Sequence, residues 1–225
     1  MLISCWALKG GSGTTVVAVA LGSLLARRHP GGAVLVDLAG DIPAALGEDR
    51  PGSGVADWLA AGSTVAPDGW GRLEVPVGRR LGLVPRGHGP LHGDERCEVL
   101  AGMLAAGDRP VIVDCGVLAS PEPGEPVVGV GAGHVLAARA TYSLLVTRAC
   151  YLSLRRCARL PLRPSGVVLL QEPSRSLRRA DVEAAVGAPI VAEVPYDAAV
   201  ARAVDRGELA RSMPRSLSRA LRAAA

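Results

Sequence analysis

The sequence predicts an α/β domain in which a mostly parallel sheet forms the middle of three layers and helices cover both of its faces. Three observations predict this class. Short segments rich in Val, Leu and Ile alternate with segments rich in Ala, Leu and Arg, an order typical of parallel strands joined by helical crossovers. The short segments are apolar throughout, as expected for strands buried on both faces. The length of 225 residues suits a single domain, residues 1–225, with one sizeable core.

The individual elements follow from this pattern in chain order. Residues 2–7 are apolar and predict the first strand, and an unbroken run of Val, Ala and Leu over residues 14–28 predicts the first helix. Later short apolar segments, each followed by a turn signal, predict the other strands. The complete set of expected strands is 2–7, 33–38, 81–85, 110–115, 143–147, 166–170 and 189–194. The stretch Ser120–Gly133 is rich in Pro, Gly and Glu and is expected to be a loop.

A glycine-rich loop joins the first strand to the first helix. It consists of Leu8, Lys9, Gly10, Gly11, Ser12, Gly13, Thr14 and Thr15. Backbone N–H groups of such a loop, together with a helix N-terminus, form a binding site for phosphate groups. Lys9 is the only lysine among the 25 Lys and Arg residues, and its compact ammonium suits close approach to a phosphate oxygen. The alternative is a glycine-rich turn without a ligand.

This loop resembles the deviant Walker A motif of the MinD/ParA ATPases, x-K-G-G-x-G-K-[ST]. The resemblance implies a P-loop NTPase fold, ATP and Mg²⁺ as cofactors, and a homodimer that encloses nucleotide. It implies that Lys9 is the signature lysine, which reaches the partner copy's phosphates, and that Thr15 ligates Mg²⁺. Thr14 stands where the family has a second lysine, so a charge that stabilises the transition state of phosphoryl transfer is missing.

Three acidic residues complete the implied catalytic and metal site. Asp37 ends the second strand, and Asp114 ends the strand over 110–115 in the arrangement of a Walker B motif. The resemblance assigns both to the Mg²⁺ site. Ala39 replaces the carboxylate that orients the attacking water in the family, and Asp41 is the candidate substitute. The alternative for Asp41 is an N-cap of the segment that follows it.

Two later segments resemble the parts of the family that bind the adenine base. Glu172 falls where relatives carry an Asn that reads the adenine edge, and Pro195 and Asp197 lie in a segment that relatives pack beside the base. A carboxylate at position 172 accepts a hydrogen bond from the exocyclic amine but donates none. The alternative is ordinary turn chemistry, because Pro and Asp commonly follow strands.

Composition narrows the location and the partners. Five scattered cysteines without a C-x-x-C pair indicate buried thiols in a reducing cytoplasm, and no segment is long enough for an integral membrane helix. The net charge is +4. Basic residues are concentrated near the C-terminus, at Arg202, Arg206, Arg211, Arg215, Arg219 and Arg222. They predict either non-specific contact with DNA phosphates or a solvated helix face.

These features give three functional hypotheses. The first is an ATP-binding, slowly hydrolysing switch of the MinD/ParA type, similar to the pilus-localising CpaE/TadZ members. It would dimerise, answer to a protein partner that stimulates or reads its nucleotide state, and position DNA, pilus machinery or other cargo. The second is a catalytically inactive P-loop scaffold that dimerises constitutively and recruits partners. The third, a metabolic synthetase with the same fold, ranks last because the sequence shows no second substrate site.

Overall fold

The structure is a computed structural model that describes residues 1–48, 52–62, 67–119, 131–157, 162–173 and 175–225. Most of the loop predicted at Ser120–Gly133 lies outside these ranges. All five cysteines are free thiols, and four of them are buried. Within the described ranges, no helix has the length and apolar character needed to span a membrane.

A single eight-stranded sheet forms the middle of the described structure, in the order β3-β4-β2-β5-β1-β6-β7-β8. Its strands are β1 (Leu2–Ala7), β2 (Ala33–Asp37), β3 (Val75–Gly78), β4 (Leu81–Val84), β5 (Val111–Val117), β6 (Tyr142–Arg148), β7 (Gly166–Leu170) and β8 (Ile190–Val194). Neighbouring strands are parallel, except that β3 runs antiparallel to β4. The crossover β1–α1–β2 leaves β5 between β1 and β2, so the loops after these three strands meet at one edge.

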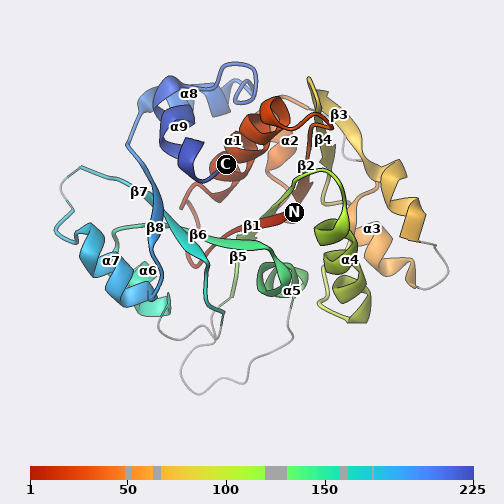
Figure 1. Ribbon diagram of the computed structural model, residues 1–225, viewed down its shortest axis with the longest axis horizontal. Helices are drawn as coiled ribbons and strands as arrows, with labels where there is room; N and C mark the ends of the chain where they lie inside the picture. Colours follow the sequence, from red (N-terminus) through yellow and green to blue (C-terminus); the bar gives the residue numbers. More distant parts are fainter. Residues whose placement is uncertain (49–51, 63–66, 120–130, 158–161, 174) are drawn as a thin grey trace.

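Helices cover both faces of the sheet (Figure 1). One face packs against α1 (Thr14–Arg28), α2 (Ile42–Leu46), α8 (Ala198–Asp205), α9 (Arg215–Ala220) and the short 3₁₀ turn η3 (Leu221–Ala223). The other packs against α3 (Val55–Ala60), α4 (Glu95–Ala106), α5 (Ala132–Arg139), α6 (Tyr151–Cys157) and α7 (Arg179–Val186), with η2 (Pro67–Leu73) beside α3. The expectation of a three-layer, mostly parallel α/β fold is therefore confirmed.

Alternation along the central strand explains how one short segment serves both layers. Leu2 and Trp6 of β1 belong to the core under α4 and α5, while Ile3 and Cys5 belong to the core under α1. Side chains of a strand point to opposite faces in turn, so five apolar residues in six supply both layers. Trp6 is fully buried, and its indole N–H donates a 2.9 Å hydrogen bond to the Ser143 hydroxyl.

The sheet contains one strand that the sequence pattern does not predict. β3 is four residues long, contains Pro76, and leaves three of its residues exposed. It lies at the edge of the sheet, where a proline is tolerated because its missing N–H faces away from the neighbouring strand. A strand of this kind has neither the apolar run nor the alternation that reveals the other seven.

Candidate phosphate-binding site

The loop between β1 and α1 owes its conformation to glycine. Gly11 and Gly13 have φ values of 72° and 82°, in the left-handed region that other residues enter only at a cost. Gly13 is the N-cap residue of α1 and makes no side-chain cap, so the first amides of the helix remain free for a ligand. The Ser12 hydroxyl donates a 2.7 Å hydrogen bond to the Lys9 carbonyl and closes the turn.

A cavity of about 480 Å³ lies over this loop. Its lining consists of Lys9, Gly10, Gly11, Ser12, Gly13, Thr14, Thr15, Val16, Leu38, Ala39, Asp41, Cys115, Gly116 and Val117. A Cβ placed on Gly10 or Gly11 would meet no protein atom within 4 Å. The two glycines therefore leave open space over the backbone, as a phosphate cradle requires.

Asp114 is buried beneath the cavity on β5 and lies in register with Asp37 on β2. Its Oδ1 accepts a 3.0 Å hydrogen bond from the Gly116 amide, whereas the buried Oδ2 has no hydrogen-bond partner. Burial raises the pKa of Asp114 to about 6. The Thr15 hydroxyl and the Gly116 amide lower the pKa and partly offset this rise. Thr15 lies near the carboxylate but makes no hydrogen bond of normal geometry to Oδ2.

Asp37 has a different environment. Its Oδ1 accepts a 2.7 Å hydrogen bond from the Gly40 amide, and its Oδ2 accepts a 3.1 Å bond from the Ile42 amide. These amides lower the pKa of Asp37, but burial outweighs them and the net shift is upward. Both oxygens thus hold the turn that follows β2, and a metal at Asp37 would share them with this turn.

Asp41 was expected either to orient the attacking water or to act as an N-cap, and its position is compatible with both. It occupies the N-cap position of α2, yet its side chain accepts no capping hydrogen bond. The residue is exposed and lines the cavity beside Ala39. Its carboxylate therefore makes no local cap at the wall of this cavity.

The donor set beside the loop fits a magnesium ion. A hydroxyl from Thr15 and carboxylates from Asp114 and Asp41 provide oxygen ligands of the kind that Mg²⁺ prefers, directly or through water. A buried carboxylate oxygen without a partner, such as Oδ2 of Asp114, is costly. A cation or a water bound to it would remove that cost.

Two arginines hold the phosphate loop from outside, and the sequence analysis did not single them out. Arg148, at the end of β6, donates to the Gly11 carbonyl and to Glu172, the latter over 2.6 Å. Arg156, on α6, donates a 2.8 Å hydrogen bond to the Leu8 carbonyl. Both bonds hold carbonyl groups on the outer side of the loop. No sequence signal marks them, because they lie more than 130 positions from the loop.

The predicted adenine-side residues do not gather in one place. Both carboxylate oxygens of Glu172 are engaged, one by Arg148 and the other by Arg175, and Arg175 is the main reason that the pKa of Glu172 is lowered. Glu172 lines a hollow with Pro173, Arg175 and Tyr196, and Tyr196 is 71% exposed. An aromatic ring and a proline are apolar surfaces on which a base can stack.

Pro195 and Asp197 support the fold beside this hollow. Pro195 is exposed at the end of β8. Asp197 caps α8 by accepting a 2.8 Å hydrogen bond from the Ala199 amide, and its other oxygen accepts a 2.5 Å bond from the Ser216 hydroxyl. Asp197 thereby joins α8 to α9, which is the turn chemistry that the alternative interpretation predicts.

Lys9 has no acidic partner within the described residues. Its side chain is exposed, and its charge acts on the nearby Cys150. The pKa of the Cys150 thiol is lowered chiefly by the amide of Ser153, with help from the Leu152 amide and from Lys9 and Arg175. This exposed ammonium, at the rim of the glycine-rich loop, is therefore available to an anion bound by the same chain or by a second copy.

Comparison with known proteins supports the fold. No protein-family model matches the sequence, and no curated protein matches it. Among solved structures, a ParA family ATPase from Chlorobium tepidum matches with a TM-score of 0.73 and 18% identity, covering 98% of this chain and 95% of that one. The cell division ATPase MinD from Pyrococcus furiosus matches at 0.70 and 20%, covering 100% and 99%. MinD from Pyrococcus horikoshii in complex with Mg-ADP matches at 0.69 and 16%, covering 97% and 91%. The chain therefore has the fold of the ParA and MinD ATPases over its whole length.

Proposed function

We propose that this protein is a ParA/MinD-like nucleotide switch that binds Mg-ATP in the cavity over residues 8–15. One observation carries the proposal: the glycine loop and Thr15 line a single cavity, and Thr15 lies beside the buried carboxylate of Asp114. ParA and MinD proteins of the same fold are ATPases by name, and one of them holds Mg-ADP. The deviant Walker A interpretation of Lys9 rests on the sequence.

Each part of the loop has a defined task in this proposal. The amides of residues 10–15 bind the phosphate oxygens, and Arg148 and Arg156 hold the loop carbonyls outward so that these amides face the cavity. Thr15 and Asp114 hold the metal, which neutralises phosphate charge when bound. The hollow lined by Glu172 and Tyr196 binds the adenine base.

Hydrolysis is expected to be slow. Thr14 is an uncharged and buried residue, so the loop lacks a cation that would stabilise charge on the transferring phosphoryl group. Asp41 is the carboxylate at the cavity that is free of a cap and can orient water. Slow hydrolysis of this kind suits a switch whose nucleotide state a protein partner stimulates or reads.

Exposed apolar side chains near the cavity support a homodimer across this face. Val117 lines the cavity and is 52% exposed. Tyr151 and Leu152 follow Cys150 and are 68% and 55% exposed. Large apolar residues at the mouth of a polar site are typical of a surface that a partner covers. In such a dimer, Lys9 would contact the phosphates held by the other copy.

The cargo follows from the resemblance and from surface charge. We propose DNA, pilus machinery or another assembly positioned within the cytoplasm. Arginines on and around α8 and α9 are exposed, including Arg202, Arg215 and Arg219, and favour non-specific contact with DNA phosphates. The second candidate function is an inactive scaffold that dimerises without nucleotide, and it is favoured by Thr14 and Ala39 at the two altered catalytic positions.

Equilibrium binding of a fluorescent ATP analogue with Mg²⁺ tests the proposal on wild type and Lys9→Ala. Loss of one charged phosphate contact should weaken binding by about 10- to 100-fold. Light scattering should show a dimer that forms only with Mg-ATP and is lost in Lys9→Ala. Absence of binding up to millimolar ATP, together with a dimer in both proteins, would support the scaffold instead.

A further inference from the structure

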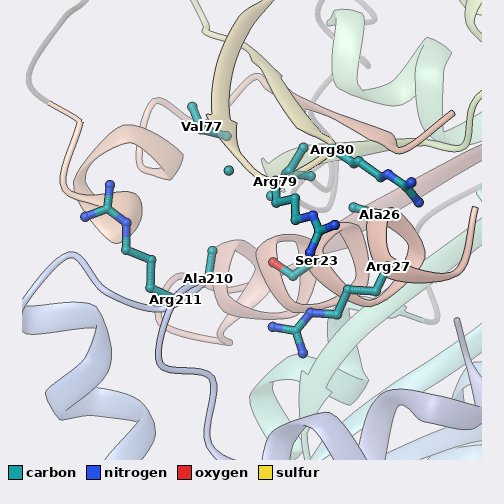
Figure 2. A pocket seen from close by; sticks show the side chains of 10 residues that line it. Ser23, Ala26, Arg27, Val77, Arg79, Arg80, Ala210 and Arg211 are labelled. Atoms are coloured by element: carbon teal, nitrogen blue, oxygen red, sulfur yellow. The ribbon is translucent and has the colours of Figure 1, made fainter. Parts of the chain in front are cut away.

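A second cavity lies at the opposite end of α1 from the phosphate loop (Figure 2). It has a volume of about 620 Å³, which is within the range of small-molecule sites. Its lining consists of Ser23, Ala26, Arg27, Val77, Gly78, Arg79, Arg80, Leu81, Ala210 and Arg211. Four of these ten residues are arginine and none is acidic. The described ion pairs include none of the four arginines.

The arginines come from three separate parts of the fold. Arg27 lies on α1, Arg79 and Arg80 form the turn between β3 and β4, and Arg211 lies between α8 and α9. Figure 2 shows Arg79 reaching from the hairpin toward Ser23 on α1, with Arg211 on the far side and Arg80 directed away. Four arginines from three separate segments thus line one cavity, which is not the pattern of a single solvated helix face.

The hairpin turn is held in an unfavourable conformation. Arg80 has a φ of 61° and is the one non-glycine residue with a left-handed backbone in the described structure, which costs about 1–2 kcal/mol. Its carbonyl accepts a 2.9 Å hydrogen bond from the Ala33 amide. A Cβ on Gly32 would overlap this carbonyl. The contact with residues 32–33 therefore fixes the turn that presents Arg79.

The segment that carries Arg211 is also anchored. The Arg211 amide donates a 3.0 Å hydrogen bond to the Glu208 carbonyl, and the Leu209 amide donates a 3.3 Å bond to the Ala45 carbonyl of α2. Leu209 itself is fully buried. Both rims of the cavity are thus tied to the core, and little backbone ordering is needed when a ligand binds.

From this geometry we propose that the cavity binds a soluble anion with two or more adjacent phosphate groups. Guanidinium groups donate paired hydrogen bonds to phosphate oxygens, and an anion in the cavity would offset the like charges of Arg27, Arg79 and Arg211, which line it. A concave cavity suits a compact polyphosphate better than the convex backbone of duplex DNA. The site is separate from the nucleotide site and does not depend on it.

Isothermal titration with tripolyphosphate in EDTA tests this site. The titration uses a Gly13→Ala background, in which the phosphate loop is expected to bind phosphate groups much more weakly. One equivalent should bind, and Arg79→Ala or Arg211→Ala should each weaken binding by about tenfold or more. The matched control Arg139→Ala removes an exposed arginine of α5 that pairs with Glu98 and should change the affinity less than about twofold.

A second readout uses the unaltered chain. The Nε–Hε NMR signals of Arg79 and Arg211 should shift with tripolyphosphate even when Mg-ATP is saturating. Equal affinity in Arg79→Ala and Arg139→Ala, or unshifted signals for both cavity arginines, would overturn the proposal. Tight, Arg79-dependent binding of a short DNA duplex without binding of tripolyphosphate would also overturn it and assign a nucleic-acid surface.

Discussion

The two ends of α1 offer different groups to an anion. At its N-terminus, the loop over residues 8–15 offers backbone amides, one lysine and buried carboxylates beside them. Near its C-terminus, the second cavity offers arginine side chains and no carboxylate. The first end suits an anion that arrives with a metal ion, because the carboxylates need a cation. The second suits an anion that arrives alone.

This difference also predicts which substitutions each of the two sites tolerates. Amides exist at every residue except proline, so the phosphate loop keeps its cradle although Thr14 replaces a lysine. What the loop cannot lose is the glycine conformation that aims those amides. The arginine cavity depends instead on its side chains, since the groups that would bind an anion are the guanidinium groups of its lining.

The largest expected effect comes from Gly13→Ala. The new Cβ would lie 2.6 Å from Leu170 Cδ2, at a residue whose φ is +82°, so Leu170 or the loop must shift and the left-handed backbone of the loop becomes strained. We expect Mg-ATP affinity to fall by roughly two orders of magnitude. Gly102→Ala is the matched control, because a Cβ on this helical glycine meets nothing within 4 Å. Nearly normal affinity in Gly13→Ala would show that the loop does not bind the phosphates.

Asp114→Asn should have opposite effects on the stability of the metal-free protein and on its magnesium-dependent binding of ATP. Burial raises the pKa of Asp114 from 3.8 to about 6, so the folded protein holds this proton more tightly than the unfolded chain. The metal-free wild type should therefore lose stability relative to Asp114→Asn as pH rises from about 4 to about 6, and the difference persists at pH 7. At pH 7, Asn should stabilise the metal-free fold by about 1–3 kcal/mol and abolish the magnesium dependence of ATP binding.

Urea unfolding in EDTA measures this stability. Asp108→Asn, which changes an exposed carboxylate before β5, should shift the free energy of unfolding by less than about 0.5 kcal/mol. A destabilised Asp114→Asn at pH 7, or a difference in stability between wild type and Asp114→Asn that does not change between pH 4 and 6, would contradict the assignment of a buried carboxylate that lacks a partner.

Restoring the missing positive charge at position 14 should increase the affinity of the loop for nucleotide. Thr14→Lys places an ammonium where the related motif has one, and we expect Mg-ATP affinity to rise about tenfold. Fluorescence titration measures the change. An unchanged or weaker affinity would indicate that Thr14 is adapted to its buried position.

A smaller effect is expected from the outer support of the loop. Arg148→Ala removes the hydrogen bond to the Gly11 carbonyl and frees Glu172, so ATP affinity should fall about three- to tenfold. Arg148→Lys keeps the charge but not the planar fork that reaches both partners, and it should restore little. Full recovery with Lys would mean that Arg148 acts only through its charge.

The layered fold and the loop were predictable because both depend on local pattern. Apolar strands such as residues 2–7 and 166–170 carry their own signal, and the observed strands have the same bounds. The glycines of the loop are likewise visible, since left-handed residues demand them. The edge strand Val75–Gly78 was missed because its stability comes from pairing with β4 rather than from its composition.

Contacts between distant segments were not predictable. Arg148 and Arg156 reach the loop from β6 and α6, and nothing in their neighbourhood distinguishes them from the other arginines. For the same reason the sequence did not show that Arg175 and Arg148 engage Glu172, or that Arg211 and Arg79 share a cavity. Tertiary placement, rather than residue type, decides which arginines act.

Hydrogen–deuterium exchange with and without Mg-ATP tests most directly whether the backbone of the loop holds the nucleotide. The account predicts slower exchange of the amides in residues 10–15, a weaker effect in Lys9→Ala, and unchanged exchange in the hairpin over residues 75–84. Protection confined to the hairpin, or unchanged exchange of the loop at saturating Mg-ATP, would contradict the central claim.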